Sequence, residues 1–159
     1  PNKNIYFLLI HNNKKILPTL LSRCLNFKIS LSNEKAINIV NKLIDKNIYD
    51  IINEDLLDYY LSPGNIYNLI RFSIENKIDL KNTNLKSFIS LLIDNSYYKK
   101  KNLDKKILYD FIELYLIKNI YLSYANLFSY FIKRIKDTKR FNLDEESLFI
   151  EFKSKVLNE

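Results

Sequence analysis

Leu17-Pro18-Thr19-Leu20-Leu21-Ser22-Arg23-Cys24 is the stretch from which the N-terminal part of this 159-residue chain can be interpreted. Proline lacks an amide hydrogen and fits only the first turn of a helix, so Pro18 predicts a short helix that begins near Leu17 and ends at Ser22 or Arg23. An arginine then follows a helix C-terminus directly. The helix dipole alone would favour a cation there, by about 0.3 to 1 kcal/mol.

Two apolar segments flank this short helix. Ile5–Ile10 is an almost unbroken apolar run, which is typical of a strand buried on both faces of a parallel sheet. A second short strand is expected over Leu25–Ile29. Residues 1–30 are therefore predicted to be the strand-helix-strand remnant of an α/β domain. The opening on Pro1, immediately before a core strand, favours a C-terminal fragment of a longer protein.

This order, closing on Ser22-Arg23-Cys24, resembles the end of the nucleotide-binding domain of AAA+ clamp-loader subunits, and most of all the delta prime type of bacterial DNA polymerase III. The resemblance implies that Arg23 is an arginine finger, with Ser22 and Cys24 fixing the turn that directs it at ATP held by a neighbouring subunit. A planar, permanently charged guanidinium can stabilise the charge that develops during phosphoryl transfer. The resemblance also places His11 or Asn12 at the sensor 1 position, although a polar residue that merely closes a strand is the simpler interpretation.

The chain contains one glycine, Gly64, which excludes a glycine-rich phosphate loop in these residues. No cofactor is therefore expected here, and ATP would be bound by the neighbouring subunit. One cysteine, Cys24, and one histidine, His11, make a metal site improbable.

Residues 31–77 have helical periodicity and predict three helices, the first capped by Ser32 and the third beginning at Ser62-Pro63-Gly64. The expected buried positions include Leu43 and Ile74. This unit resembles the lid of clamp loaders, whose last helix carries a sensor 2 arginine three residues after a glycine. Tyr67 occupies that position, as suits a subunit that does not hydrolyse ATP.

Residues 78–159 predict a four-helix bundle, which the resemblance identifies as the collar that joins subunits into a ring. Asn142 and Glu145 have the spacing of a capping box before the last helix. The 12 tyrosines and 10 phenylalanines fit either an interface or an A+T-rich codon bias. The predicted helices cover 84–97, 103–118, 120 or 121 to 136, and 144–156.

The net charge of +7 leaves nucleic-acid binding open. Two basic clusters stand out, at 99–106 and at 133–140, and solvated helix ends are the simpler interpretation of both. No run reaches the roughly 18 apolar residues of a membrane span, so no membrane contact is expected. The resemblance to clamp-loader subunits implies a cytoplasmic location in the nucleoid-associated replisome.

The fold is thus predicted to be mostly α, with an α/β remnant, a three-helix lid and a helical collar. The expected function is that of a non-hydrolysing clamp-loader subunit without a catalytic site of its own in these residues. Its partners would be the ATPase subunits and the delta subunit of a hetero-oligomeric ring, and through them the sliding clamp and primed DNA. Two alternatives stay open: an ATP-hydrolysing clamp-loader subunit whose phosphate loop lies outside this sequence, and a basic, all-helical nucleic-acid-binding module.

Overall fold

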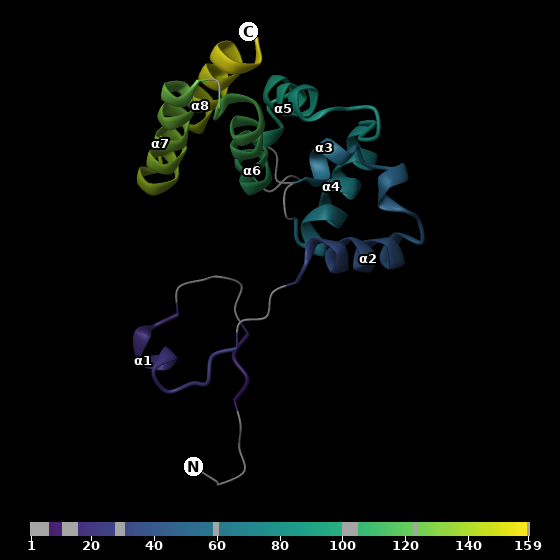
Figure 1. Cartoon of the computed structure of the whole chain (residues 1–159), viewed down its shortest axis with the longest axis vertical. Helices are drawn as coiled ribbons and strands as arrows, with labels where there is room; N and C mark the ends of the chain where they lie inside the picture. The colour runs from purple at the N-terminus through teal and green to yellow at the C-terminus, as the bar shows by residue number, and fades with distance from the viewer. Residues whose placement is uncertain are drawn as a thin grey trace. The chain divides into compact units, whose positions relative to one another are not determined.

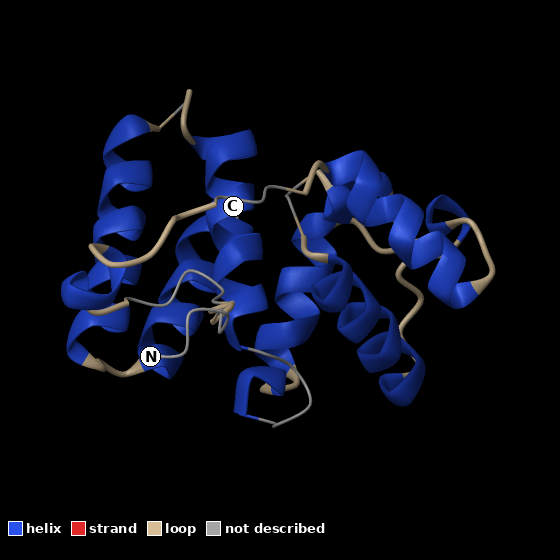
Figure 2. Cartoon of the chain, turned by 90° about the horizontal axis from the view of Figure 1, so that it is seen from below, coloured by secondary structure: helices blue, strands red, loops and turns tan. Residues whose placement is uncertain are grey.

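The computed structural model describes residues 7–10, 16–27, 31–58, 61–99, 105–122 and 124–158. Every regular element in these ranges is a helix (Figure 2). The chain divides into two compact units, Pro1–Ser30 and Leu31–Glu159. The expected mostly α class is confirmed for the described part of the chain.

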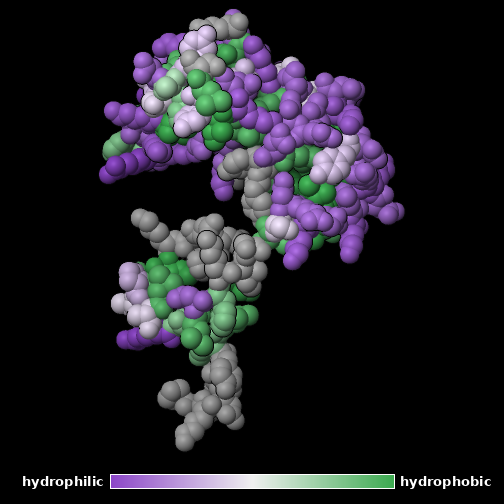
Figure 3. Space-filling model, in the orientation of Figure 1, coloured by the Kyte–Doolittle hydropathy of each residue, from purple (hydrophilic) through white to green (hydrophobic). Residues whose placement is uncertain are grey.

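Unit 1 contains one short helix, α1 (Pro18–Leu21). The two predicted strands are not found: residues 7–10 and 25–27 have no regular structure, and the remaining residues of both segments lie outside the described ranges. Phe7 and Leu25 each leave 88% of their surface exposed, and hydrophobic residues make up much of the described surface of the unit (Figure 3). A strand requires a partner that completes its hydrogen-bond ladder, and no described residue provides one.

The first half of unit 2 begins as the sequence predicts. Ser32 caps α2, since its Oγ accepts a hydrogen bond from the Lys35 amide at 3.3 Å, and α2 packs against α4. Leu43 and Ile74 were expected to be buried but are 64% and 71% exposed; the buried faces of α2 and α4 include their neighbours Ile44, which packs against the core, and Ser73 instead. The elements are α2 (Asn33–Ile44), η1 (Ile48–Asp50), α3 (Glu54–Leu57) and α4 (Pro63–Asn76).

The second half of unit 2 is a bundle in which α5 packs on α6 and α7 on α8 (Figure 1). Two π-helical turns, η3 and η4, extend α6 and α8 without a break. The elements are α5 (Leu85–Asp94), η2 (Tyr97–Lys99), α6 (Lys105–Tyr115), η3 (Leu116–Ile120), α7 (Ala125–Phe141), α8 (Glu145–Phe152) and η4 (Lys153–Leu157).

The junction between α7 and α8 differs from the predicted capping box. Asn142 does not cap α8; its φ of 50° places it in the left-handed region, where asparagine is tolerated and commonly ends a helix. The cap of α8 is Asp144, whose carboxylate accepts hydrogen bonds from the amides of Glu146 and Ser147 at 3.2 and 3.1 Å. As a result, α7 continues to Phe141, beyond the predicted end at residue 136.

One hydrophobic core extends through unit 2, from Ile37 to Leu157. It contains residues from both ranges predicted as lid and collar. Hydrogen bonds also join these ranges: the Asn53 amide donates to the Leu80 carbonyl at 2.9 Å, and Lys81 Nζ donates to the Tyr49 carbonyl at 2.6 Å. Because residues 31–77 and 78–159 contribute to one core, their packing does not separate a lid from a collar. That division stays a prediction.

Candidate functional site

The turn after α1 holds the arginine that the sequence singled out. Pro18 occupies the first helical position, and Leu17 before it is extended, as a residue preceding proline prefers. The helix has only four residues and closes tightly: the Arg23 amide donates to the Leu20 carbonyl at 3.1 Å, and Ser22 Oγ donates to the Thr19 carbonyl at 3.2 Å. The backbone at Arg23 is therefore fixed by local hydrogen bonds.

Two further contacts define the residues on the far side of this turn. The Cys24 amide donates to the Leu21 carbonyl at 3.4 Å, and Asn26 Nδ2 donates to the same carbonyl at 3.4 Å. Cys24 carries a free, exposed thiol. Ser22, Arg23 and Cys24 thus form one short turn stabilised by the end of α1.

The guanidinium of Arg23 is exposed and forms no ion pair with any residue that the structure describes. Water can satisfy its exposed N–H donors, and the same donors are free to bind another molecule. A guanidinium presents five N–H donors in a planar fork that matches carboxylate and phosphate oxygens. The arrangement can bind a phosphoryl group or a carboxylate presented by another molecule.

The other residues named from the sequence lie elsewhere. His11 and Asn12 fall outside the described residues. Tyr67 lies in the second turn of α4 and is 43% exposed. Arg71, one turn further, donates to Glu75 Oε1 at 3.2 Å. Arg71 therefore already has a carboxylate partner on its own helix.

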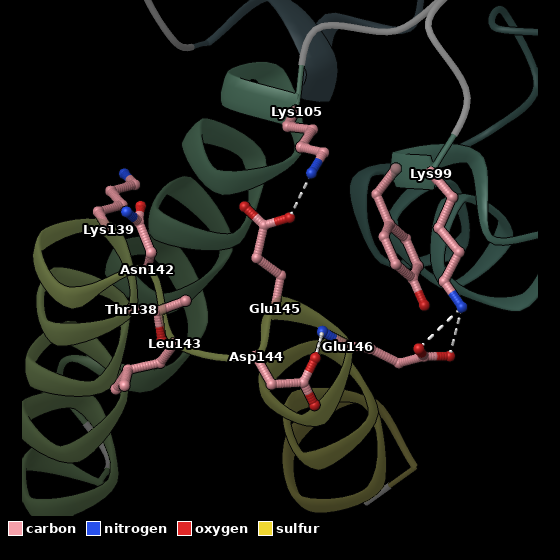
Figure 4. A pocket seen from close by; sticks show the side chains of 10 residues that line it. Lys99, Lys105, Thr138, Lys139, Asn142, Leu143, Asp144, Glu145 and Glu146 are labelled. Atoms are coloured by element: carbon pink, nitrogen blue, oxygen red, sulfur yellow. Dashed lines mark hydrogen bonds and ion pairs between the residues drawn. The ribbon is translucent and has the colours of Figure 1, made fainter.

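A hollow of about 620 Å³ near the α7–α8 turn brings together charged side chains from η2, α6, α7 and α8 (Figure 4). Its lysines belong to the two basic clusters noted in the sequence, but the glutamates that pair with Lys99 and Lys105 lie in α8, so sequence spacing does not reveal the pairing. Lys99 pairs with Glu146 at 2.8 Å, and Lys105 pairs with Glu145 at 2.7 Å. These exposed ion pairs connect η2 and α6 to α8 and contribute little to stability. Lys139, the third lysine that lines the hollow, pairs with Glu113 at 2.9 Å, so all three lysines have carboxylate partners.

Tyr109 lies beside this hollow, with Lys139 Nζ 4.6 Å from its ring centroid. It is 4% exposed, and its hydroxyl forms no hydrogen bond of good geometry with any described residue, although the Glu145 carboxylate is near enough to interact with it. Burial, with the nearby charge of Glu145 as a second cause, raises the pKa of Tyr109 well above its ordinary value of 10. The folded chain therefore keeps this proton at alkaline pH.

We expect Tyr109→Phe to equal or exceed the parent chain in stability at pH 7, by up to about 1 kcal/mol, because it removes a buried hydroxyl that lacks a well-formed hydrogen bond. In the unfolded parent, Tyr109 loses its proton above about pH 10 while the folded state retains it. The free energy of unfolding should then fall with rising pH, by up to about 1.4 kcal/mol per pH unit for this residue. Urea denaturation at pH 7 and above pH 10 measures the difference, which should be smaller in the variant. An identical alkaline decline in both proteins would contradict the assignment.

The described residues contain neither a membrane-spanning helix nor a cluster of metal-ligating side chains. None of their helices has the length and apolar character that crossing a bilayer requires. No three of their histidine, cysteine, aspartate and glutamate side chains are grouped as metal ligands would be.

No protein-family model, no curated protein and no solved structure matches this chain.

Proposed function

We propose that this chain belongs to a clamp-loader subunit of the delta prime type, which does not hydrolyse ATP and supplies Arg23 in trans to an ATPase subunit of the same ring. The observation that carries the proposal is the exposed guanidinium at the end of a proline-initiated turn, which forms no ion pair with any residue that the structure describes. In this role Arg23 stabilises charge on the γ-phosphate while the neighbour provides the nucleotide site.

The helical part of the chain supports the same proposal. Unit 2 is helical in all its regular elements, as a lid followed by a collar requires. Tyr67, where hydrolysing relatives would have an arginine, favours a non-hydrolysing subunit over one that binds and cleaves its own ATP. The proposed partners are the ATPase and delta subunits, and the proposed place of action is the cytoplasmic replisome, at the sliding clamp on primed DNA.

Co-purification tests the proposal. The chain, in the full-length subunit of its source organism, should form a stable complex with the clamp-loader ATPase subunits and delta. The complex should form at a salt concentration that suppresses non-specific binding to DNA. If the subunit binds DNA but never the ATPase subunits, the alternative of an independent nucleic-acid-binding module is correct.

A further inference from the structure

The basic cluster on α7 is divided by the fold into two faces. Arg134 and Lys139 are engaged inside unit 2: Arg134 Nη2 donates to Ser147 Oγ at 3.2 Å, and Lys139 Nζ pairs with Glu113 at 2.9 Å. Lys133, Lys136 and Arg140 are exposed and form no ion pair with any described residue. The three exposed cations are called the α7 ridge below.

The α7 ridge borders a shallow hollow of about 420 Å³. Its cations recur at intervals of three and four residues, which puts them on one face of the helix, about 4.5 and 6 Å apart along its axis. Phe128 and Ile132 form an apolar wall beside them. Asp137 is the one carboxylate among the described residues that line the hollow, so positive charge exceeds negative charge there.

Exposed aromatic rings lie at both ends of the ridge. The ring of Tyr121, 55% exposed, meets Phe128 edge to face at a centroid distance of 5.0 Å. At the other end Phe141 is 59% exposed, and the guanidinium carbon of Arg140 lies 5.1 Å from its ring centroid. Each ring offers a face on which a planar base can stack.

We propose that the α7 ridge and its flanking rings bind single-stranded nucleic acid. Cations in a row neutralise the phosphates of one strand, and aromatic rings beside them stack on bases that are not paired. An acidic protein segment would satisfy the cations equally but would leave the exposed rings without a role. The proposal concerns residues distant in sequence from Arg23 and does not rest on the role assigned to that residue.

The experiment is fluorescence anisotropy of a labelled oligothymidylate with the full chain over a series of salt concentrations. The ridge variant is Lys133→Gln/Lys136→Gln/Arg140→Gln. The matched control, Lys35→Gln/Lys42→Gln/Lys46→Gln, removes the same charge from exposed positions in and after α2. The ridge variant should bind at least about tenfold more weakly at low salt, and its slope of log K against log salt should be shallower by about 2, since each cation contributes about 0.7.

A second variant, Tyr121→Leu/Phe141→Leu, separates stacking from charge. It should weaken binding at least about fivefold and leave the salt slope unchanged, because stacking involves no counterion release. Thermal melting of each variant checks that the fold is retained.

Three outcomes would overturn the proposal. Binding by the ridge variant could equal that of the parent chain, or the α2 control could lose as much affinity as the ridge variant. Alternatively, oligoglutamate could bind the parent as tightly as oligothymidylate while the ring variant retains full affinity. The last result would assign the surface to an acidic protein partner.

Discussion

Phe152→Ala should lower the free energy of unfolding of unit 2 by about 3 to 5 kcal/mol, the range measured for large-to-small changes at buried aromatic positions. Phe152 is fully buried at the end of α8. Its ring packs edge to face against Phe131 of α7 and Tyr115 of α6, with centroid distances of 5.3 and 6.2 Å. The side chain thus joins three helices, and the cavity left by its removal cannot be filled by one local adjustment. A loss of this size is a large share of the total free energy of unfolding, which is about 5 to 15 kcal/mol for a typical folded domain.

Ile150→Ala provides the control, because Ile150 lies in the same helix but is mostly exposed. Its effect should stay within about 0.5 kcal/mol. Urea denaturation followed by circular dichroism at 222 nm gives both values. Equal losses for Phe152→Ala and Ile150→Ala would mean that the core around α8 is not packed as described.

Arg23→Ala should leave the reconstituted ring assembled and reduce ATP turnover. At the one site that Arg23 completes, loss of a trans arginine is expected to slow hydrolysis by about 10³-fold or more. Other sites of the ring keep their own arginines, so the whole complex should lose turnover and clamp loading only in part. Arg23→Lys should retain little of the function, because an ammonium group has no planar fork.

Steady-state ATPase and clamp-loading assays with primed DNA measure this effect. Arg71→Ala is the matched control, since it removes another exposed arginine, one whose guanidinium is paired with Glu75 on its own helix. Gel filtration of each reconstituted ring confirms assembly. The finger assignment is wrong if the Arg23→Ala ring turns over ATP at the parent rate in a single-site assay.

The helical part of the fold follows from local patterns in the sequence. The stripes of apolar residues in 85–94 and 105–115 correctly predict buried faces, because i, i+3 and i+4 positions share one side of a helix. The helix predicted from residue 120 or 121 begins only at Ala125, and Tyr124 before it is exposed. Periodicity identifies a face, but the length over which a neighbour covers that face is a tertiary property.

The strands are the larger failure, and its cause is physical. An apolar run such as 5–10 records a tendency to be buried, whereas a strand exists only where a second strand completes its hydrogen bonds. The described residues 7–10 and 25–27 have no such partner. The sequence therefore predicted the short helix between these runs, which depends on Pro18 and local hydrogen bonds, better than the runs themselves.

The candidate sites also differ in how far they could be predicted from the sequence. The turn at Ser22, Arg23 and Cys24 is local, so its geometry could be anticipated from residue types. The separation of the α7 cations into paired and exposed sets could not, because it depends on Glu113 and Ser147, which come from other helices. The pairing of Lys99 and Lys105 with α8 depends on long-range contacts as well.

Cross-linking from Cys24 tests most directly whether Arg23 reaches a neighbouring nucleotide site. Cys24 is the one cysteine of the chain, lies next to Arg23, and is exposed. It can therefore carry a thiol-reactive photo-cross-linker without any substitution within this sequence. In the assembled ring, with ATP bound, the label should form cross-links to the phosphate-binding loop of an adjacent ATPase subunit. An assembled, photolysed ring in which Cys24 cross-links only within its own chain would contradict the account.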